Sequence, residues 1–83
     1  MIEIQEGQLV RVKSWDTLVD DDVEYTEDGE ANFENVSCPV HMLEHLKDED
    51  IWWRVDRVDE EGDFSLKMLY GTYPNEIILE VTG

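Results

Sequence analysis

Apolar and polar residues alternate along four stretches of the chain, and such alternation is typical of half-buried β-strands. The stretches are residues 7–15, 51–59, 64–70 and 77–81. Neighbouring side chains of a strand point to opposite faces, so each stretch has one face that is mainly apolar. The residues expected to point inward are Val10, Val12, Ile51, Trp53, Val55, Phe64, Leu66, Met68, Ile77, Leu79 and Val81.

The adjacent residues Trp52 and Trp53 cannot both enter one core if they lie in a strand. Trp53 shares its face with Ile51 and Val55, whereas Trp52 shares its face with charged residues. We therefore expect Trp53 to be buried and Trp52 to be exposed, provided that no bulge shifts the register.

Residues 37–50 have a helical pattern instead. An apolar stripe at helical spacing is formed by Met42, Leu43 and Leu46. Ser37 can cap such a helix, and Pro39 fits its first turn. The acidic run that begins at Asp48 opposes the helix dipole, so we expect the helix to be short.

Residues 16–37 are rich in acidic residues and have no clear period. This segment predicts a long acidic loop, with a helical turn at residues 16–19 and short extended pieces. The apolar residues expected to hold it against the body are Val19, Val23, Tyr25 and Phe33.

Four or five short strands, one short helix and one long acidic loop make up the predicted fold of a single domain, residues 1–83. Short antiparallel strands in so small a chain favour a barrel, because closure removes exposed strand edges. We therefore predict a mainly β protein, a small and partly open antiparallel barrel.

The opening of the first strand carries a motif that can be written V-R-V-x-S-W-D-x-L. Its residues are Val10, Arg11, Val12, Ser14, Trp15, Asp16 and Leu18. This motif resembles the V-R-[IV]-x-S-W-[DE]-x-[ML] opening of small phage- and prophage-encoded proteins with a Src-homology-3-like barrel. The resemblance implies a barrel of that type and an origin in a mobile element, but no particular activity.

The 22 acidic and 6 basic residues give a formal net charge of −16. Self-repulsion of this size destabilises a compact state, so we expect stability to rise with added salt. The charge should repel nucleic acid and anionic membranes and attract basic partners. Cys38 is the single cysteine, which excludes an internal disulfide. With no signal-peptide or membrane-span pattern either, we expect a protein of the host-cell cytoplasm.

Metal binding and catalysis find little support in the motifs. Cys38, His41 and His45 follow the spacing C-x-x-H-x-x-x-H, which places both histidines on one helical face. The paired cysteine spacings of structural zinc sites are absent, so we predict no metal, although this set leaves the question open. The acidic runs lack calcium-loop spacing. Without a nucleophile–base pair or a phosphate loop, we predict a non-enzymatic protein with no cofactor.

The charge favours binding to a basic protein surface. Duplex DNA carries about one charge per 1.7 Å of its axis, and the proteins that bind it present basic clefts. A small rigid protein can occupy such a cleft as a DNA mimic, and the phage resemblance favours an inhibitor of a host or defence protein. The simpler alternative is that the acidic residues only keep the protein soluble. The residues predicted to contact the partner are Asp20, Asp21, Asp22, Glu27, Asp28, Glu30, Trp52, Asp59, Glu60, Glu61 and Asp63.

A second hypothesis is a counter-defence protein that sequesters a signalling nucleotide. Trp52 would stack on the base and Arg54 would bind a phosphate, with Tyr73 contributed by a nearby turn. Trp52 would instead complete the core if the acidic loop covered it. A third hypothesis is a small structural or accessory phage protein. Salt distinguishes the first hypothesis from the others, because a DNA mimic should lose affinity steeply as ionic strength rises.

Overall fold

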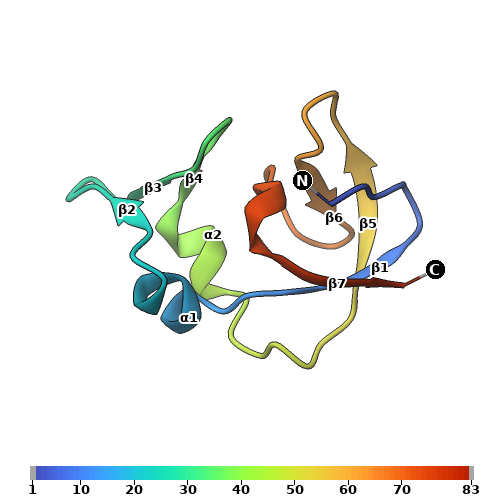
Figure 1. Cartoon of the computed structure of the whole chain (residues 1–83), viewed down its shortest axis with the longest axis horizontal. Coiled ribbons are helices and arrows are strands. Elements are labelled where there is room, and N and C mark those ends of the chain that lie inside the picture. The colour runs from blue at the N-terminus through green and yellow to red at the C-terminus, as the bar shows by residue number, and fades with distance from the viewer. Residues whose placement is uncertain (1, 83) are drawn as a thin grey trace.

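The computed structural model describes residues 2–82 (Figure 1). Its elements in chain order are β1 (Leu9–Val12), α1 (Trp15–Asp20), β2 (Glu24–Tyr25), β3 (Glu30–Asn32), β4 (Ser37–Pro39), α2 (Val40–Glu44), β5 (Trp53–Val58), β6 (Phe64–Leu66), the 3-10 helix η1 (Asn75–Ile77) and β7 (Ile78–Thr82). Among these described residues, no helix has the length and apolarity needed to cross a bilayer.

The strands form two antiparallel sheets. The larger sheet has the order β6-β5-β1-β7, and the smaller sheet has the order β2-β3-β4. Figure 1 shows the two sheets at opposite ends of the long axis, with α1 and α2 beside the smaller one. Over residues 2–82 the strands do not close into a barrel. The prediction of a mainly β, partly open antiparallel fold is therefore confirmed.

The two adjacent tryptophans lie as predicted. Trp53 begins β5 and packs, half-buried, against the core, whereas Trp52 directly precedes the strand and is 40% exposed. Ile51 was expected to point inward, but it is exposed because β5 begins only at Trp53. The bulge in β5 follows Val55 and so leaves the orientation of both tryptophans unchanged.

A bulge between β1 and β7 changes the orientation predicted for one residue. Arg11 pairs with Glu80 and Val12 pairs with Ile78, so Leu79 is the extra residue between two paired positions. A bulged residue no longer follows the strict alternation of its strand. Leu79 is therefore exposed, contrary to the prediction, and Ile78 takes the buried position.

The predicted strand at residues 64–70 ends early, at Leu66. The backbone N–H of Lys67 donates to Arg54 O, and that of Leu69 donates to Leu66 O, so the chain turns immediately after β6. Met68 has φ of 72°, in the left-handed region that non-glycine residues rarely adopt. The turn leaves Met68 99% exposed, which corrects its predicted place in the core.

The acidic segment contains more regular structure than the predicted loop. The helical turn is confirmed by α1, and the rest of the segment supplies β2, β3 and part of β4. Ser14 caps α1, because its hydroxyl oxygen accepts the backbone N–H of Thr17. Ser37 and Cys38 belong to β4, so the second helix begins later than predicted, at Val40.

One apolar cluster joins the two sheets. It contains strand residues from both sheets and one leucine from each short helix. Those joining residues are Val10, Val12, Val55, Leu66, Ala31, Cys38, Leu18 and Leu43. Of the residues expected to hold the acidic segment, Val23 and Phe33 pack against this cluster, whereas Val19 and Tyr25 are exposed. Both sheets therefore depend on a single core.

Replacement of Leu43 by alanine tests this shared core. Leu43 is fully buried in α2, and deletion of such a side chain costs about 2–5 kcal/mol of unfolding free energy. His41→Ala is the matched control, since His41 is exposed on the same helix and should change stability by about 0.5 kcal/mol or less. Urea unfolding followed by tryptophan fluorescence measures both. Equal losses would contradict a core that depends on Leu43.

Candidate partner-binding surfaces

Three of the predicted carboxylates lie where α1 ends. Asp20 is the last residue of α1, Asp21 is its C-cap, and Asp22 follows with φ of 62°. All three are exposed, and Asp21 forms an ion pair of 3.1 Å with Lys13. Anions at a helix C-terminus oppose the helix dipole, and the last turn of α1 holds no basic residue. The arrangement is locally unfavourable, and such conflicts are expected at functional positions.

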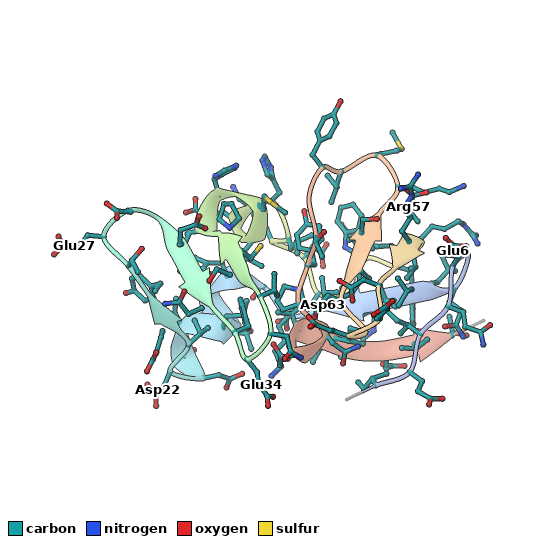
Figure 2. The ribbon with its side chains drawn as sticks, turned by 90° about the horizontal axis from the view of Figure 1, so that it is seen from above. Glu6, Asp22, Glu27, Glu34, Arg57 and Asp63 are labelled. Carbon is teal, nitrogen blue, oxygen red and sulfur yellow. The ribbon has the colours of Figure 1, made fainter. Side chains whose placement is uncertain are left out.

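The turn between β2 and β3 carries Glu27 and Asp28. Thr26 closes this turn, because its N–H donates to Glu30 O while its hydroxyl accepts the N–H of Glu30. Figure 2 shows Glu27 at the end of the molecule where the smaller sheet lies, and Asp22 lies near the same end. The turn therefore holds two exposed carboxylates at the tip of the molecule.

The third acidic group lies in the turn between β5 and β6. Asp59 holds this turn, because its Oδ1 accepts the backbone N–H groups of Glu61 at 2.9 Å and Asp63 at 3.0 Å. Glu60 and Glu61 are exposed. Asp63 is only 1% exposed, and its carboxylate accepts the N–H of Asn75. Asp63 thus ties two segments of the fold together and has no exposed carboxylate for a partner, contrary to the prediction.

Glu30 also departs from the predicted surface. It is half-buried in β3, and its Oε2 is a buried atom without a hydrogen-bond partner in the described residues. Across the sheet Glu30 pairs with Pro39, the residue that follows Cys38. Burial, and then the charge of Glu30, raises the pKa of Cys38 to about 11. The charge of Glu30 therefore affects the buried thiol of the smaller sheet.

Two further carboxylates lie near these acidic groups, and the sequence analysis did not identify either of them. Glu34 lies in the turn between β3 and β4, and Glu76 lies in η1. Burial raises the pKa of Glu76, and the charges of Asp63 and then Glu34 raise it further. In Figure 2, Glu34 lies between Asp22 and Asp63 along the long axis. The carboxylates of the two sheets therefore approach one another where the sheets meet.

The residues of the nucleotide hypothesis do not form one site. Tyr73 is 1% exposed and packs beside Phe64, with ring centroids 6.0 Å apart. Arg54 lies on the surface and donates to Gly7 O. Arg11 lies over the ring of Trp52, with its guanidinium carbon 5.5 Å from the ring centroid. Trp52 is thus an exposed aromatic residue whose ring already has a cationic partner.

The three residues of the C-x-x-H-x-x-x-H spacing also differ in burial. Cys38 is fully buried in β4, whereas His41 and His45 are exposed at either end of α2. Burial raises the pKa of the metal-free Cys38 thiol to about 11, which disfavours the thiolate. Residues 2–82 contain no group of three or more His, Cys, Asp or Glu side chains arranged to hold a metal ion.

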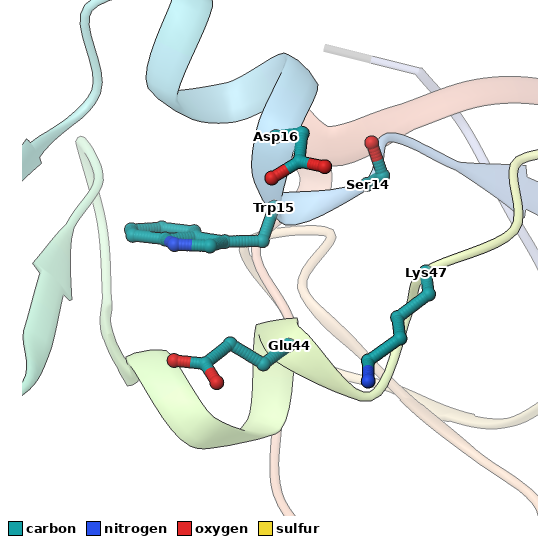
Figure 3. Close-up of a pocket in the computed structure, with 5 residues that line it drawn as sticks. All are labelled: Ser14, Trp15, Asp16, Glu44 and Lys47. Carbon is teal, nitrogen blue, oxygen red and sulfur yellow. The ribbon is translucent and has the colours of Figure 1, made fainter.

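A cleft of about 370 Å³ opens where α1 faces α2 (Figure 3). The residues that line it are Ser14, Trp15, Asp16, Glu44 and Lys47. Glu49 fixes its rim, because its Oε2 accepts the backbone N–H of Ser14 at 2.7 Å. This bond, and then the hydroxyl of Thr17, lowers the pKa of Glu49. The sequence motif drew attention to Trp15 and Asp16, but only the fold brings Glu44 and Lys47 beside them.

Comparison with known proteins found no matching family model, no matching curated protein and no matching solved structure. The resemblance to small phage proteins with a Src-homology-3-like barrel therefore stays a prediction.

Glu76→Gln tests the contact between the acidic groups. A raised pKa means that the folded state penalises the charged form of Glu76, so the penalty is present at neutral pH and fades as pH falls through that pKa. The variant should melt at a higher temperature than the wild type at about pH 7, and the gain should disappear below about pH 4. Thermal unfolding measures the difference. Glu60→Gln makes the same charge change in the turn between β5 and β6 and should gain less.

Proposed function

We propose that this protein is a non-enzymatic acidic binding protein that occupies a basic surface of another protein. The observation that carries the proposal is the lack of internal neutralisation. In the described part of the chain, ion pairs are formed by Arg11 and Lys13 alone, with Asp50, Glu80 and Asp21. Most of the exposed carboxylates therefore have no cationic partner of their own. Such uncompensated charge attracts basic clefts over long range.

The three acidic turns supply a prearranged set of charges. Backbone and side-chain hydrogen bonds fix the turns after α1, between β2 and β3, and between β5 and β6. Fixed turns lose little conformational entropy on binding, which favours affinity. The revised partner surface consists of Asp20, Asp21, Asp22, Glu27, Asp28, Glu34, Asp59, Glu60 and Glu61.

The partner that fits this surface best is a protein whose basic surface normally contacts nucleic acid. A formal net charge of −16 on a compact body of 36 × 27 × 23 Å is a high density of negative charge, and basic nucleic-acid-binding clefts attract such density. Inhibition of a host or defence protein follows from occupation of its cleft. The phage-like opening motif supports that setting.

Capture from bacterial lysate tests this function. The immobilised protein should retain nucleic-acid-binding proteins at about 50 mM salt and lose most of them by about 200 mM, because each phosphate-like contact adds to the salt dependence. Duplex DNA added to the column should displace the same proteins. Retention that is insensitive to both salt and DNA would contradict a DNA mimic.

A pair of charge-matched variants locates the surface. Glu27→Gln with Asp28→Asn removes two charges from the tip of the smaller sheet. Glu3→Gln with Glu6→Gln removes two exposed charges from the N-terminal segment, and Figure 2 places Glu6 at the opposite end of the molecule. The first variant should reduce capture several-fold, and the second should have little effect. Equal effects would indicate that net charge alone causes retention.

A further inference from the structure

Trp52 and the cleft at Trp15 share a chemical arrangement. At Trp52, Arg11 lies over the indole ring and pairs with the carboxylates of Asp50 and Glu80. The unit is thus an indole, a guanidinium and two carboxylates. Arginine favours such places, because its planar guanidinium stacks on an aromatic ring while its N–H groups bind carboxylates.

The cleft contains the indole and the two carboxylates without the guanidinium. Figure 3 shows the ring of Trp15 between the carboxylates of Asp16 and Glu44. Both carboxylates are exposed, and neither forms an ion pair in the described part of the chain. The ammonium of Lys47 lies across the cleft from the indole ring. Two acids and one base leave the cleft with a net negative charge.

The indole of Trp15 is held in place before any ligand arrives. Trp15 is half-buried and begins α1, directly after the capping residue Ser14. Tyr25 of β2 contacts its ring edge-to-face, with centroids 5.4 Å apart and an interplanar angle of 71°. The helix cap fixes the backbone of Trp15, and Tyr25 packs against the edge of its ring. The ring therefore offers a preformed stacking face, which lowers the entropic cost of binding.

We propose that this cleft binds an arginine side chain of the basic partner. The guanidinium would stack on Trp15 and bind the carboxylates of Asp16 and Glu44, as Arg11 does at Trp52 within the chain. A volume of about 370 Å³ is at the small end of ligand pockets and suits one side chain. The inference rests on the proposed function and gives it an anchor, since tryptophan and arginine are both enriched among the hot-spot residues of interfaces.

Nitrogen-15 NMR of the three indole N–H groups tests the proposal, with N-acetyl-arginine amide as the probe and N-acetyl-citrulline amide as its neutral control. Trp15→Phe assigns the Trp15 resonance. The arginine probe should shift this resonance in a saturable way and leave the Trp52 resonance nearly unchanged, because Arg11 already lies over that ring and occupies the carboxylates of Asp50 and Glu80. Equal shifts with citrulline, or comparable shifts of all three indoles, would overturn the proposal.

The sign of a Lys47 substitution identifies the charge of the ligand. Lys47→Gln should strengthen binding of the arginine probe, whereas Asp16→Asn and Glu44→Gln should each weaken it by about two- to fivefold. All three residues are exposed or at the rim, so the variants should retain the wild-type spectrum elsewhere. An anionic ligand would reverse every sign. Weaker binding after Lys47→Gln would therefore overturn the proposal.

The two proposals fail in different ways. If lysate proteins are still captured in a salt-sensitive manner while the arginine probe leaves Trp15 unchanged, the arginine site is wrong and the acidic surface stands. If the probe binds at Trp15 but no basic protein is retained, the site stands as local chemistry and the binding function is wrong. Capture that falls several-fold in Trp15→Phe supports both.

Discussion

Twenty-two acidic side chains repel one another on a chain of 83 residues, and the apolar cluster shared by both sheets has to outweigh that repulsion. The smaller sheet has strands of only two or three residues, too short to be stable alone. Its place depends on Ala31, Cys38 and the leucines of the two helices, which join it to the larger sheet. The acidic turns at its tip are thus held by a core that their own charges weaken.

Two basic residues, Arg11 and Lys13, offset part of this repulsion through their ion pairs. Arg11 lies in β1 and Lys13 directly follows it, and both point away from the core. Lys13 holds the carboxylate at the end of α1, while Arg11 connects β7, the acidic run before β5 and the ring of Trp52. Within the described residues, these two cations link β1 to neighbouring segments and form no ion pair with the acidic turns between β2 and β3 and between β5 and β6.

Sequence alternation identified the larger sheet well, including the opposite orientations of Trp52 and Trp53. It failed at Leu79 because a bulge breaks the period, and at Met68 because the chain turns after Leu66. Strands as short as β2 have no period to detect, so the smaller sheet read as a loop. For the candidate site, the exposed acidic turns were predictable from composition. The burial of Asp63, the effect of Glu34 on Glu76 and the cleft shared by Trp15 and Glu44 arise only from tertiary contacts between distant segments.

Cys38 gives the fold an internal reporter. Its thiol is fully buried in an edge strand of the smaller sheet, with a pKa of about 11. Alkylating reagents act on exposed thiolates, so modification has to wait until this sheet opens. The rate of labelling under native conditions therefore measures how often the smaller sheet separates from the shared core. A ligand that bridges α1 and α2 would slow that rate without touching the thiol.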